Sequence, residues 1–235
     1  MKVLGIITAR GGSKGVPRKN IAPVAGRPLL SWTADAALRA NRLSRVILST
    51  DDEEIAAVGR SCGLEVPFMR PAELAGDATP TLPVLQHAVR FVGDQYDAVC
   101  LLQPTNPLRN SALIDGCIEL FENSHADSVV TVLPVPHEYN PHWVYWRDSA
   151  GVLSLVTGEC APIPRRQDLP PAFHREGSVY VTSTSVLMEG NSLYGRRVIG
   201  YPLQAADSVN IDSPQDLAFA EEKLARRAAA GHKPC

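Results

Sequence analysis

The start of the chain constrains the fold most, because an apolar run there passes directly into a glycine-rich, basic loop. The apolar residues among positions 3–7 predict a buried strand that ends at Ala9. The loop then reads R-G-G-S-K-G-V-P-R-K-N, with three glycines, one serine and four cations between Arg10 and Asn20. Open α/β sheets bind ligands at the carboxyl ends of their strands, where glycines let backbone N–H groups approach an anion and cations neutralise it. The loop therefore predicts a binding site for a chain of phosphates.

This loop matches neither of the two most familiar phosphate motifs. The order G-G-S-K-G differs from the dinucleotide fingerprint G-x-G-x-x-G and from the P-loop G-x-x-x-x-G-K-[ST]. A glycine-rich basic loop after a strand can also be a solvated turn without a ligand. The density of both glycine and charge favours the binding site over the turn.

Strands and helices alternate along the chain. Residues 98–102 are apolar throughout, which predicts a central strand covered on both faces. Further strands are predicted at residues 45–50, 66–69, 128–133, 178–182 and 197–201. Helices are predicted to begin near Gly26, Asp51, Thr79, Leu113 and Ser213. Repeated strand–helix units predict an α/β fold with a doubly wound, mostly parallel sheet, and we expect one domain over residues 1–235.

The pattern breaks at residues 134–171, a segment we call the arm. It is rich in proline, carries a hairpin signal near Asp148–Gly151 and has no amphipathic helix. Its run Trp143–Trp146 gathers aromatic and apolar side chains that need a covering surface. A structureless insertion of this length is uncommon in a compact domain unless it is functional or packs on a partner.

Composition and charge exclude several classes of protein. The formal net charge of −2 argues against a nucleic-acid binder that works by bulk electrostatics. No apolar run approaches the roughly 20 residues that a membrane span needs, and the apolar start is too short for a signal peptide. The five cysteines include no C-x-x-C pair, which indicates a protein of the reducing cytoplasm without a zinc site.

Four dispersed motifs resemble those of the acylneuraminate cytidylyltransferases. They are A-R-G-G-S-K-G-V-P-R-K-N in the first loop, R-P-A-E-L-A at Arg70–Ala75, L-Q-P-T-N-P-L-R at Leu102–Arg109 and R-Q-D-L-P at Arg166–Pro170. The resemblance extends over about residues 3–222, with the motifs in the family's order. It implies a Rossmann-like nucleotidyltransferase that joins CMP from CTP to a sugar acid and releases pyrophosphate. It also implies that the arm crosses to a second subunit, so that the protein is a homodimer.

The resemblance assigns residues to the nucleotide. Arg10, Ser13 and Lys19 stand where the family grips the triphosphate, and Lys19 is expected to contact the α-phosphate. Lys14 and Arg18 are expected to be either phosphate contacts or solvated charges. The full predicted set for CTP is Ala9, Arg10, Gly11, Gly12, Ser13, Lys19, Asn20, Arg70, Thr79 and Thr81. For Thr79 and Thr81, capping of the next helix is an equally good interpretation.

The metal candidate is Asp212 in S-V-N-I-D-S-P. A carboxylate at a strand end beside a bound triphosphate is a common way to hold Mg²⁺ with few protein ligands. The family usually reads D-I-D here, whereas this chain has Asn210 in place of the first aspartate. Asn210 offers a carbonyl oxygen without charge. Arg10, Lys19 and Asp212 form the predicted catalytic group, and an Asx-type cap of the next helix is the alternative role for Asp212.

On the acceptor side the expected residues are Gln103, Arg166, Gln167, His174 and Tyr180. Here the chain departs from the sialic acid enzymes, with Trp143 where a lysine is usual and H-R-E-G at His174–Gly177 where they read R-x-N-G. We expect Glu176 to add negative charge on the acceptor side, which disfavours a close carboxylate and suits an amino or hydroxyl substituent. A nonulosonic or 2-keto-3-deoxy sugar acid is the expected acceptor, with poor use of N-acetylneuraminic acid. A small phosphonate acceptor, a sugar-1-phosphate nucleotidyltransferase and a non-catalytic nucleotide sensor are the alternatives.

Overall fold

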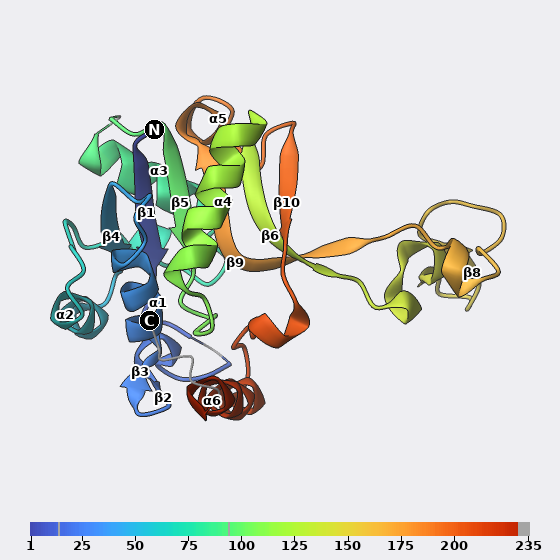
Figure 1. The fold of residues 1–235 in the computed structure, drawn as a ribbon, viewed down its shortest axis with the longest axis horizontal. Helices are drawn as coiled ribbons and strands as arrows, with labels where there is room; N and C mark the ends of the chain where they lie inside the picture. Colours follow the sequence, from blue (N-terminus) through green and yellow to red (C-terminus); the bar gives the residue numbers. More distant parts are fainter. Residues whose placement is uncertain (14, 94, 230–235) are drawn as a thin grey trace.

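A computed structural model describes residues 1–13, 15–93 and 95–229. Its centre is a six-stranded sheet in the order β10-β6-β9-β5-β1-β4 (Figure 1). The strands are β1 (Val3–Thr8), β4 (Arg45–Ser49), β5 (Ala98–Leu102), β6 (Ser128–Pro134), β9 (Phe173–Ser183) and β10 (Val198–Pro202). Only β9 runs antiparallel to its neighbours β5 and β6, and the other pairs are parallel. The predicted mostly parallel α/β sheet is confirmed.

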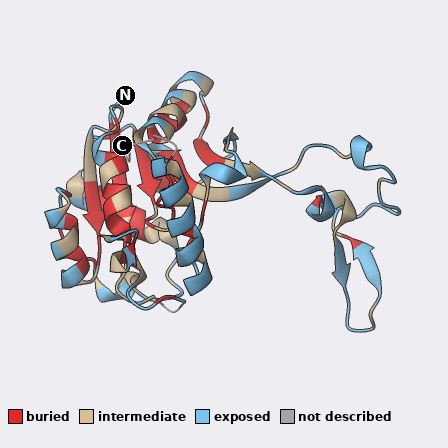
Figure 2. Ribbon diagram, turned by 60° about the horizontal axis from the view of Figure 1, so that its bottom comes forward, coloured by how far each residue is buried: buried red, intermediate tan, exposed pale blue. Residues whose placement is uncertain are grey.

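Helices cover both faces of this sheet. Side chains of α1 (Leu29–Leu38), α2 (Glu53–Ser61) and α4 (Ser111–Ser124) share one core cluster with strand residues such as Ile7 and Leu102. Side chains of α3 (Thr81–Val92) and α5 (Thr184–Met188) pack on the other face against Leu4 and Val99. Because consecutive residues of a strand point to opposite faces, the apolar strands supply both clusters. Burial is concentrated in this body (Figure 2).

A third cluster lies beyond the carboxyl ends of the strands. The last helix, α6 (Pro214–Ala229), packs Ala220 against Val24, Leu29 and Ile211. Ser213 receives a hydrogen bond from the Asp216 amide, and the Asp216 carboxylate accepts bonds from the Ser213 amide and hydroxyl. This reciprocal pair caps the helix, as predicted from serine followed by proline.

Two local predictions were wrong. The chain around Gly26 forms the turn of a hairpin between β2 (Pro23–Val24) and β3 (Arg27–Pro28), and α1 begins only at Leu29. Ala25 and Gly26 both have positive φ, 49° and 77°, which suits a tight hairpin and not a helix. Residues 66–69 form no strand. Isolated bridges to Glu65 and Met69 flank Pro67, which has no N–H group for a ladder.

The arm extends away from the body between β6 and β9 (Figures 1 and 2). It contains the predicted hairpin, formed by β7 (Tyr145–Arg147) and β8 (Leu153–Leu155), and three short 3-10 turns at His137–Tyr139, Pro141–Trp143 and Arg166–Asp168. Trp146 is 69% exposed, and Leu153 is 57% exposed. In the described part of the chain, no helix is long and apolar enough to cross a membrane.

Candidate active site

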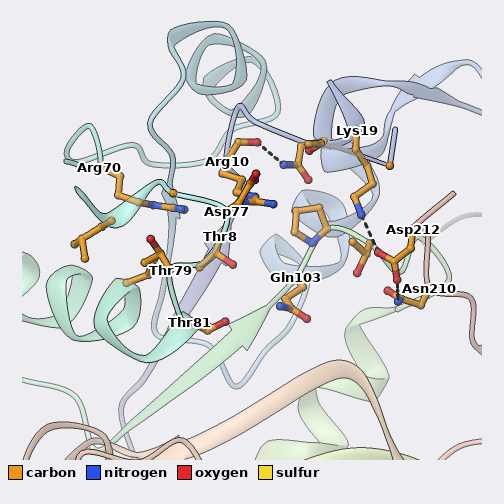
Figure 3. Close-up of a pocket in the computed structure, with 18 residues that line it drawn as sticks. Thr8, Arg10, Lys19, Arg70, Asp77, Thr79, Thr81, Gln103, Asn210 and Asp212 are labelled. Atoms are coloured by element: carbon orange, nitrogen blue, oxygen red, sulfur yellow. Dashed lines mark hydrogen bonds and ion pairs between the residues drawn. The ribbon is translucent and has the colours of Figure 1, made fainter. Parts of the chain in front are cut away.

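A pocket of about 440 Å³ opens where the carboxyl ends of β1 and β5 lie side by side (Figure 3). The register pairs Ile7 with Leu102, so the first loop and the loop at Gln103 start next to each other. Ten predicted site residues line this pocket: Arg10, Ser13, Lys19, Asn20, Arg70, Thr79, Thr81, Gln103, Asn210 and Asp212. The fold therefore brings together residues from five separate stretches of the sequence.

Each of two pocket cations pairs with a carboxylate. Arg10 forms an ion pair of 2.7 Å with Asp77. The Lys19 ammonium donates hydrogen bonds to the Ile211 carbonyl at 2.7 Å and to the Asp212 carboxylate at 3.0 Å. These contacts hold the cations over the pocket, where they can exchange a carboxylate for a phosphate oxygen.

Arg70 is only 7% exposed, and its guanidinium donates hydrogen bonds to the backbone and side chain of Ser49 at the end of β4. Burial lowers the pKa of Arg70, Asp51 opposes that shift and the neighbouring Arg10 adds to it. Asn20 is buried, and its side-chain amide donates a hydrogen bond of 2.9 Å to the Arg10 carbonyl. This bond holds the two ends of the first loop together. Arg70 thus places a rigidly held positive charge at one end of the pocket.

Thr79 and Thr81 precede and begin α3, but neither caps it. The N-cap residue is Pro80, and it makes no side-chain capping bond. Both threonines line the pocket instead. The capping interpretation is therefore wrong for this helix, and the hydroxyl groups remain suited to a ligand.

Asp212 faces the pocket with its side chain 67% exposed. It does not cap α6, because the capping carboxylate belongs to Asp216. Asn210 directs its Nδ2 group toward Asp212, so in this arrangement it orients the carboxylate. Among the described residues no group of three His, Cys, Asp or Glu side chains could hold a metal ion. One exposed carboxylate beside a pocket lined by Arg10 and Lys19 nonetheless fits Mg²⁺, which takes few protein oxygens and completes its shell with phosphates and water.

The glycines of the first loop serve close packing as well as flexibility. A Cβ atom on Gly15 would lie 2.2 Å from the Asp212 carbonyl oxygen, and one on Gly11 would lie 2.7 Å from the Asp52 carboxylate. A Cβ on Gly12 would meet nothing within 4 Å. The loop can therefore lie against the Asp212 segment only with glycine at position 15.

Three other residues of the first loop, which were candidates for contact with the nucleotide, bind other parts of the protein instead. The Ala9 amide donates to the Ser49 carbonyl, and the Gly11 amide donates to the Asp51 carboxylate at 3.2 Å. Arg18 pairs with Asp52 at 2.7 Å and also with Glu54, away from the residues that line the pocket. Lys14 lies outside the described residues.

Of the predicted acceptor residues, only Gln103 lines the pocket. Arg166 and Gln167 lie in the arm. His174 is exposed at the base of the arm, and its Nδ1 atom lies 3.2 Å from the Arg175 carbonyl. Tyr180 is buried in the sheet, where burial raises the pKa of its hydroxyl to about 12.

Glu176 does not take the acceptor-facing role that its charge suggested. Its carboxylate accepts hydrogen bonds from Asn106, Ser178 and Ser208 inside the protein, and it is absent from the pocket lining. These three bonds all reach Oε1, and the Ser178 amide donates to Oε2, so both oxygens of the carboxylate bind groups of the protein. Its position within H-R-E-G therefore says little about the acceptor.

Sequence reasoning missed several pocket residues. Thr8, Leu74, Asp77 and Thr105 line the pocket, and Asp77 is the partner of Arg10. The position of Asp77 between two predicted residues, Arg70 and Thr79, is the signal that could have identified it.

Arg109 was part of a family motif, but no role was predicted for it. It is 4% exposed and donates to the Gln103 carbonyl and to Thr33, both at 2.6 Å.

Comparison with known proteins places this pocket in context. The family described as Cytidylyltransferase matches residues 4–189 of this chain. A pseudaminic acid cytidylyltransferase from Campylobacter jejuni is 32% identical over 94% of this chain and 95% of its own length. A CMP-N,N'-diacetyllegionaminic acid synthase from Legionella pneumophila is 33% identical over 95% of this chain and 97% of its own.

A solved structure with a similar fold is that of CMP:2-keto-3-deoxy-manno-octonic acid synthetase complexed with CTP. It has a TM-score of 0.74 and covers 97% of this chain and all of the other, at 15% sequence identity. At this identity the likeness concerns the fold alone.

Proposed function

This chain belongs to the cytidylyltransferase family, and from that premise we propose that it joins CMP from CTP to a nonulosonic acid and releases pyrophosphate. The observation that carries the proposal is the pocket that gathers Arg10, Lys19 and Asp212 at the carboxyl ends of the strands. Cations for a triphosphate and a carboxylate for a metal are the groups that transfer of a nucleotide requires. Relatives named for pseudaminic and legionaminic acids support an acceptor of that class.

In the proposed reaction the anomeric hydroxyl of the acceptor attacks the α-phosphorus of CTP. The bond from that phosphorus to the bridging oxygen breaks, pyrophosphate leaves with the electron pair, and the proton of the attacking hydroxyl is released to solvent. Arg10 and Ser13 hold the phosphates in line, and Lys19 neutralises charge that moves from the α-phosphate toward the leaving group. Arg70, Asn20, Thr79 and Thr81 surround cytosine and ribose, and Gln103 binds the acceptor.

Asp212 would hold Mg²⁺, with Asn210 beside it. When bound, the ion would neutralise the triphosphate and assist departure of pyrophosphate. The Lys19 ammonium donates a hydrogen bond of 3.0 Å to this carboxylate, so the proposed metal ligand lies beside the proposed phosphate contact. The remaining acceptor candidates are Arg166 and Gln167 from the arm, and His174 and Tyr180 from β9.

We further propose that the arm makes the protein a homodimer. Tyr139, Trp146, Leu153 and Phe173 are each more than half exposed, and a second copy of the chain would cover them. The chain as a whole then acts as one domain with an exchanged arm.

Cys100 and Cys117 are buried free thiols, which suits a reducing cytoplasm.

The test is a pyrophosphate-release assay with Mg²⁺ and each nucleoside triphosphate in turn. The acceptors tested are pseudaminic, legionaminic and N-acetylneuraminic acids, 2-keto-3-deoxyoctonate, small phosphonates and a sugar 1-phosphate. We expect turnover with CTP and a nonulosonic acid other than N-acetylneuraminic acid. Turnover with a phosphonate alone would replace the acceptor class, turnover with a sugar 1-phosphate would replace the reaction, and nucleotide binding without turnover would identify a sensor.

A further inference from the structure

A buried polar network lies next to the pocket, centred on the carboxylate of Glu176. Its Oε1 atom accepts hydrogen bonds from Asn106 Nδ2 at 2.7 Å, from Ser178 Oγ at 2.6 Å and from Ser208 Oγ at 2.5 Å. Its Oε2 atom accepts one from the Ser178 amide at 2.8 Å. The Glu176 side chain therefore links three segments, namely its own strand β9, the loop that carries Asn106 and the stretch that carries Ser208.

Two of these segments carry pocket residues. Asn106 follows Gln103 in the loop after β5, and its Oδ1 atom also accepts from the Leu108 amide at 3.0 Å. Ser208 begins the stretch that leads to Asn210 and Asp212. A backbone bond of 3.0 Å from the Ile211 amide to the Thr105 carbonyl joins the same two segments closer to the pocket.

Ser208 is held from two sides. Its hydroxyl binds Glu176, and its carbonyl accepts a hydrogen bond of 2.6 Å from Lys223 of α6. The stretch 208–212 is therefore fixed between the sheet and the last helix. Because the side chain of Asp212 itself is largely exposed, its position depends on how firmly this stretch is fixed.

The network favours a charged Glu176. Burial would raise the pKa of this carboxyl, but hydrogen bonds from Ser178 and Ser208 outweigh burial and hold the pKa below its usual range. Hydrogen bonds to an ionised acceptor are roughly twice as strong as neutral ones. The buried Arg109 nearby adds positive charge and holds the carbonyl of Gln103.

We propose that Glu176 is a positioning residue that, through Ser208 and Asn106, sets the place of Asp212 relative to Gln103 and so tunes metal binding. This inference rests on the proposed function, in which Asp212 binds the metal. Loss of a group that supports a metal ligand typically lowers metal affinity by 10–100-fold. Glu176 acts through a backbone segment, so we expect the lower end of that range.

The test measures Mn²⁺ affinity in the presence of CTP by electron paramagnetic resonance, together with CTP affinity in EDTA by calorimetry. Glu176→Gln keeps the size of the side chain and removes its charge, and Ser208→Ala removes only the link to the Asp212 stretch. We expect Mn²⁺ affinity to fall about tenfold in Glu176→Gln and about threefold in Ser208→Ala. CTP affinity without metal should change less than about twofold, since the loop cations are untouched.

Asp127→Asn is the matched control. The Asp127 carboxylate also accepts two hydrogen bonds, from the amides of Arg196 and Arg197 at 2.6 and 2.8 Å, but it joins segments away from the pocket. The Asp127→Asn substitution should lower the free energy of unfolding without changing Mn²⁺ affinity. A folded Glu176→Gln variant with wild-type Mn²⁺ affinity would overturn the inference. If Glu176→Gln does not fold, wild-type Mn²⁺ affinity of Ser208→Ala would overturn it instead.

The two hypotheses can fail separately. If the wild-type protein releases pyrophosphate but both variants bind Mn²⁺ normally, only the role of Glu176 is lost. If the wild-type protein binds Mn²⁺ and CTP without turnover, the proposed function is lost while the variants still report on metal positioning. If the wild-type protein with CTP binds no Mn²⁺, the inference is overturned with the metal assignment.

Discussion

Lys19 donates a hydrogen bond of 3.0 Å to Asp212, which lies 193 residues further along the chain. The same ammonium group bonds the Ile211 carbonyl at 2.7 Å, so the first loop and the stretch before α6 meet through one side chain. In the proposed reaction, these two residues bind opposite charges, phosphate and metal. Their pairing sets both at one side of the pocket (Figure 3).

Lys19→Met keeps the apolar stem and removes the charge. We expect kcat/KM for CTP to fall by about a hundredfold or more, as for loss of one group that stabilises transition-state charge. The assay is pyrophosphate release, with circular dichroism to confirm folding. Arg18→Asn is the control, because Arg18 pairs with Asp52 and Glu54 and asparagine tolerates its φ of 54°. Near wild-type activity of a folded Lys19→Met variant would remove Lys19 from the reaction.

Asp212→Asn should weaken Mg²⁺ binding, because the amide keeps the shape of the carboxylate and loses its charge. We expect the Mg²⁺ concentration for half-maximal turnover to rise by about tenfold or more. Asn210→Asp makes the opposite change and should lower that concentration. An Mg²⁺ titration that is the same in all three proteins would exclude Asp212 as a ligand.

Gly15→Ala should disturb the loop through simple overlap. Its Cβ atom would lie 2.2 Å from the backbone oxygen of Asp212, so one segment must move. We expect a loss of about 1–3 kcal/mol in the free energy of unfolding, as for other overpacked sites, and weaker CTP binding. Gly12→Ala is the matched control, because its Cβ would meet open space. Equal unfolding midpoints of the two variants in urea would show that the loop does not need this close contact.

Glu176 gives a prediction for the pH dependence of stability. Because its pKa is lower in the folded than in the unfolded protein, its ionised form stabilises the fold above the unfolded value near pH 4.3. That stabilisation is lost as the pH falls through the lower folded value. Wild type should therefore exceed Glu176→Gln by about 1–3 kcal/mol at pH 6, and the difference should shrink below about pH 4. Urea unfolding from pH 6 to pH 3 measures it, and a difference that grows toward pH 3 would contradict the assigned bonds.

The sequence predicted the sheet and most of the nucleotide side of the pocket, because both depend on local patterns. Apolar runs identify buried strands, and parallel order brings the following loops to one edge. That reasoning located Arg10, Lys19 and Gln103 at one site, and the family motifs added Arg70 and Asp212.

Prediction was weaker where a role depends on contacts between distant segments. Charge alone suggested that Glu176 faces the acceptor, whereas Asn106, Ser178 and Ser208 surround it from three segments. The extended stretch near Pro67 was mistaken for a strand because its apolar residues matched the pattern while its missing N–H was overlooked. The error on Glu176 could not be corrected without knowing which segments pack together, whereas Pro67 is visible in the sequence.

The arm provides the last prediction, since Arg166 and Gln167 lie in it and away from the pocket of their own chain. If they bind the acceptor, they do so in a second copy of the protein. Light scattering should then give about twice the chain mass of 25.4 kDa. Trp146→Asp should produce monomers, because a charge would replace an exposed apolar side chain of the interface. Phe91→Ser, which alters a side chain 56% exposed outside the arm, is the control and should leave the dimer intact.

Mixed dimers test the exchange directly. Lys19→Met and Arg166→Ala should each be inactive when alone, the first through its pocket and the second through its arm. After the two are unfolded and refolded together, a mixed dimer contains one pocket with Lys19 that receives an arm with Arg166. Random pairing in a symmetric dimer should therefore restore roughly a quarter of wild-type turnover. No recovery from a mixture shown to contain mixed dimers would mean that Arg166 does not complete the partner's site, because the intact arm and the intact pocket would then be present together without effect.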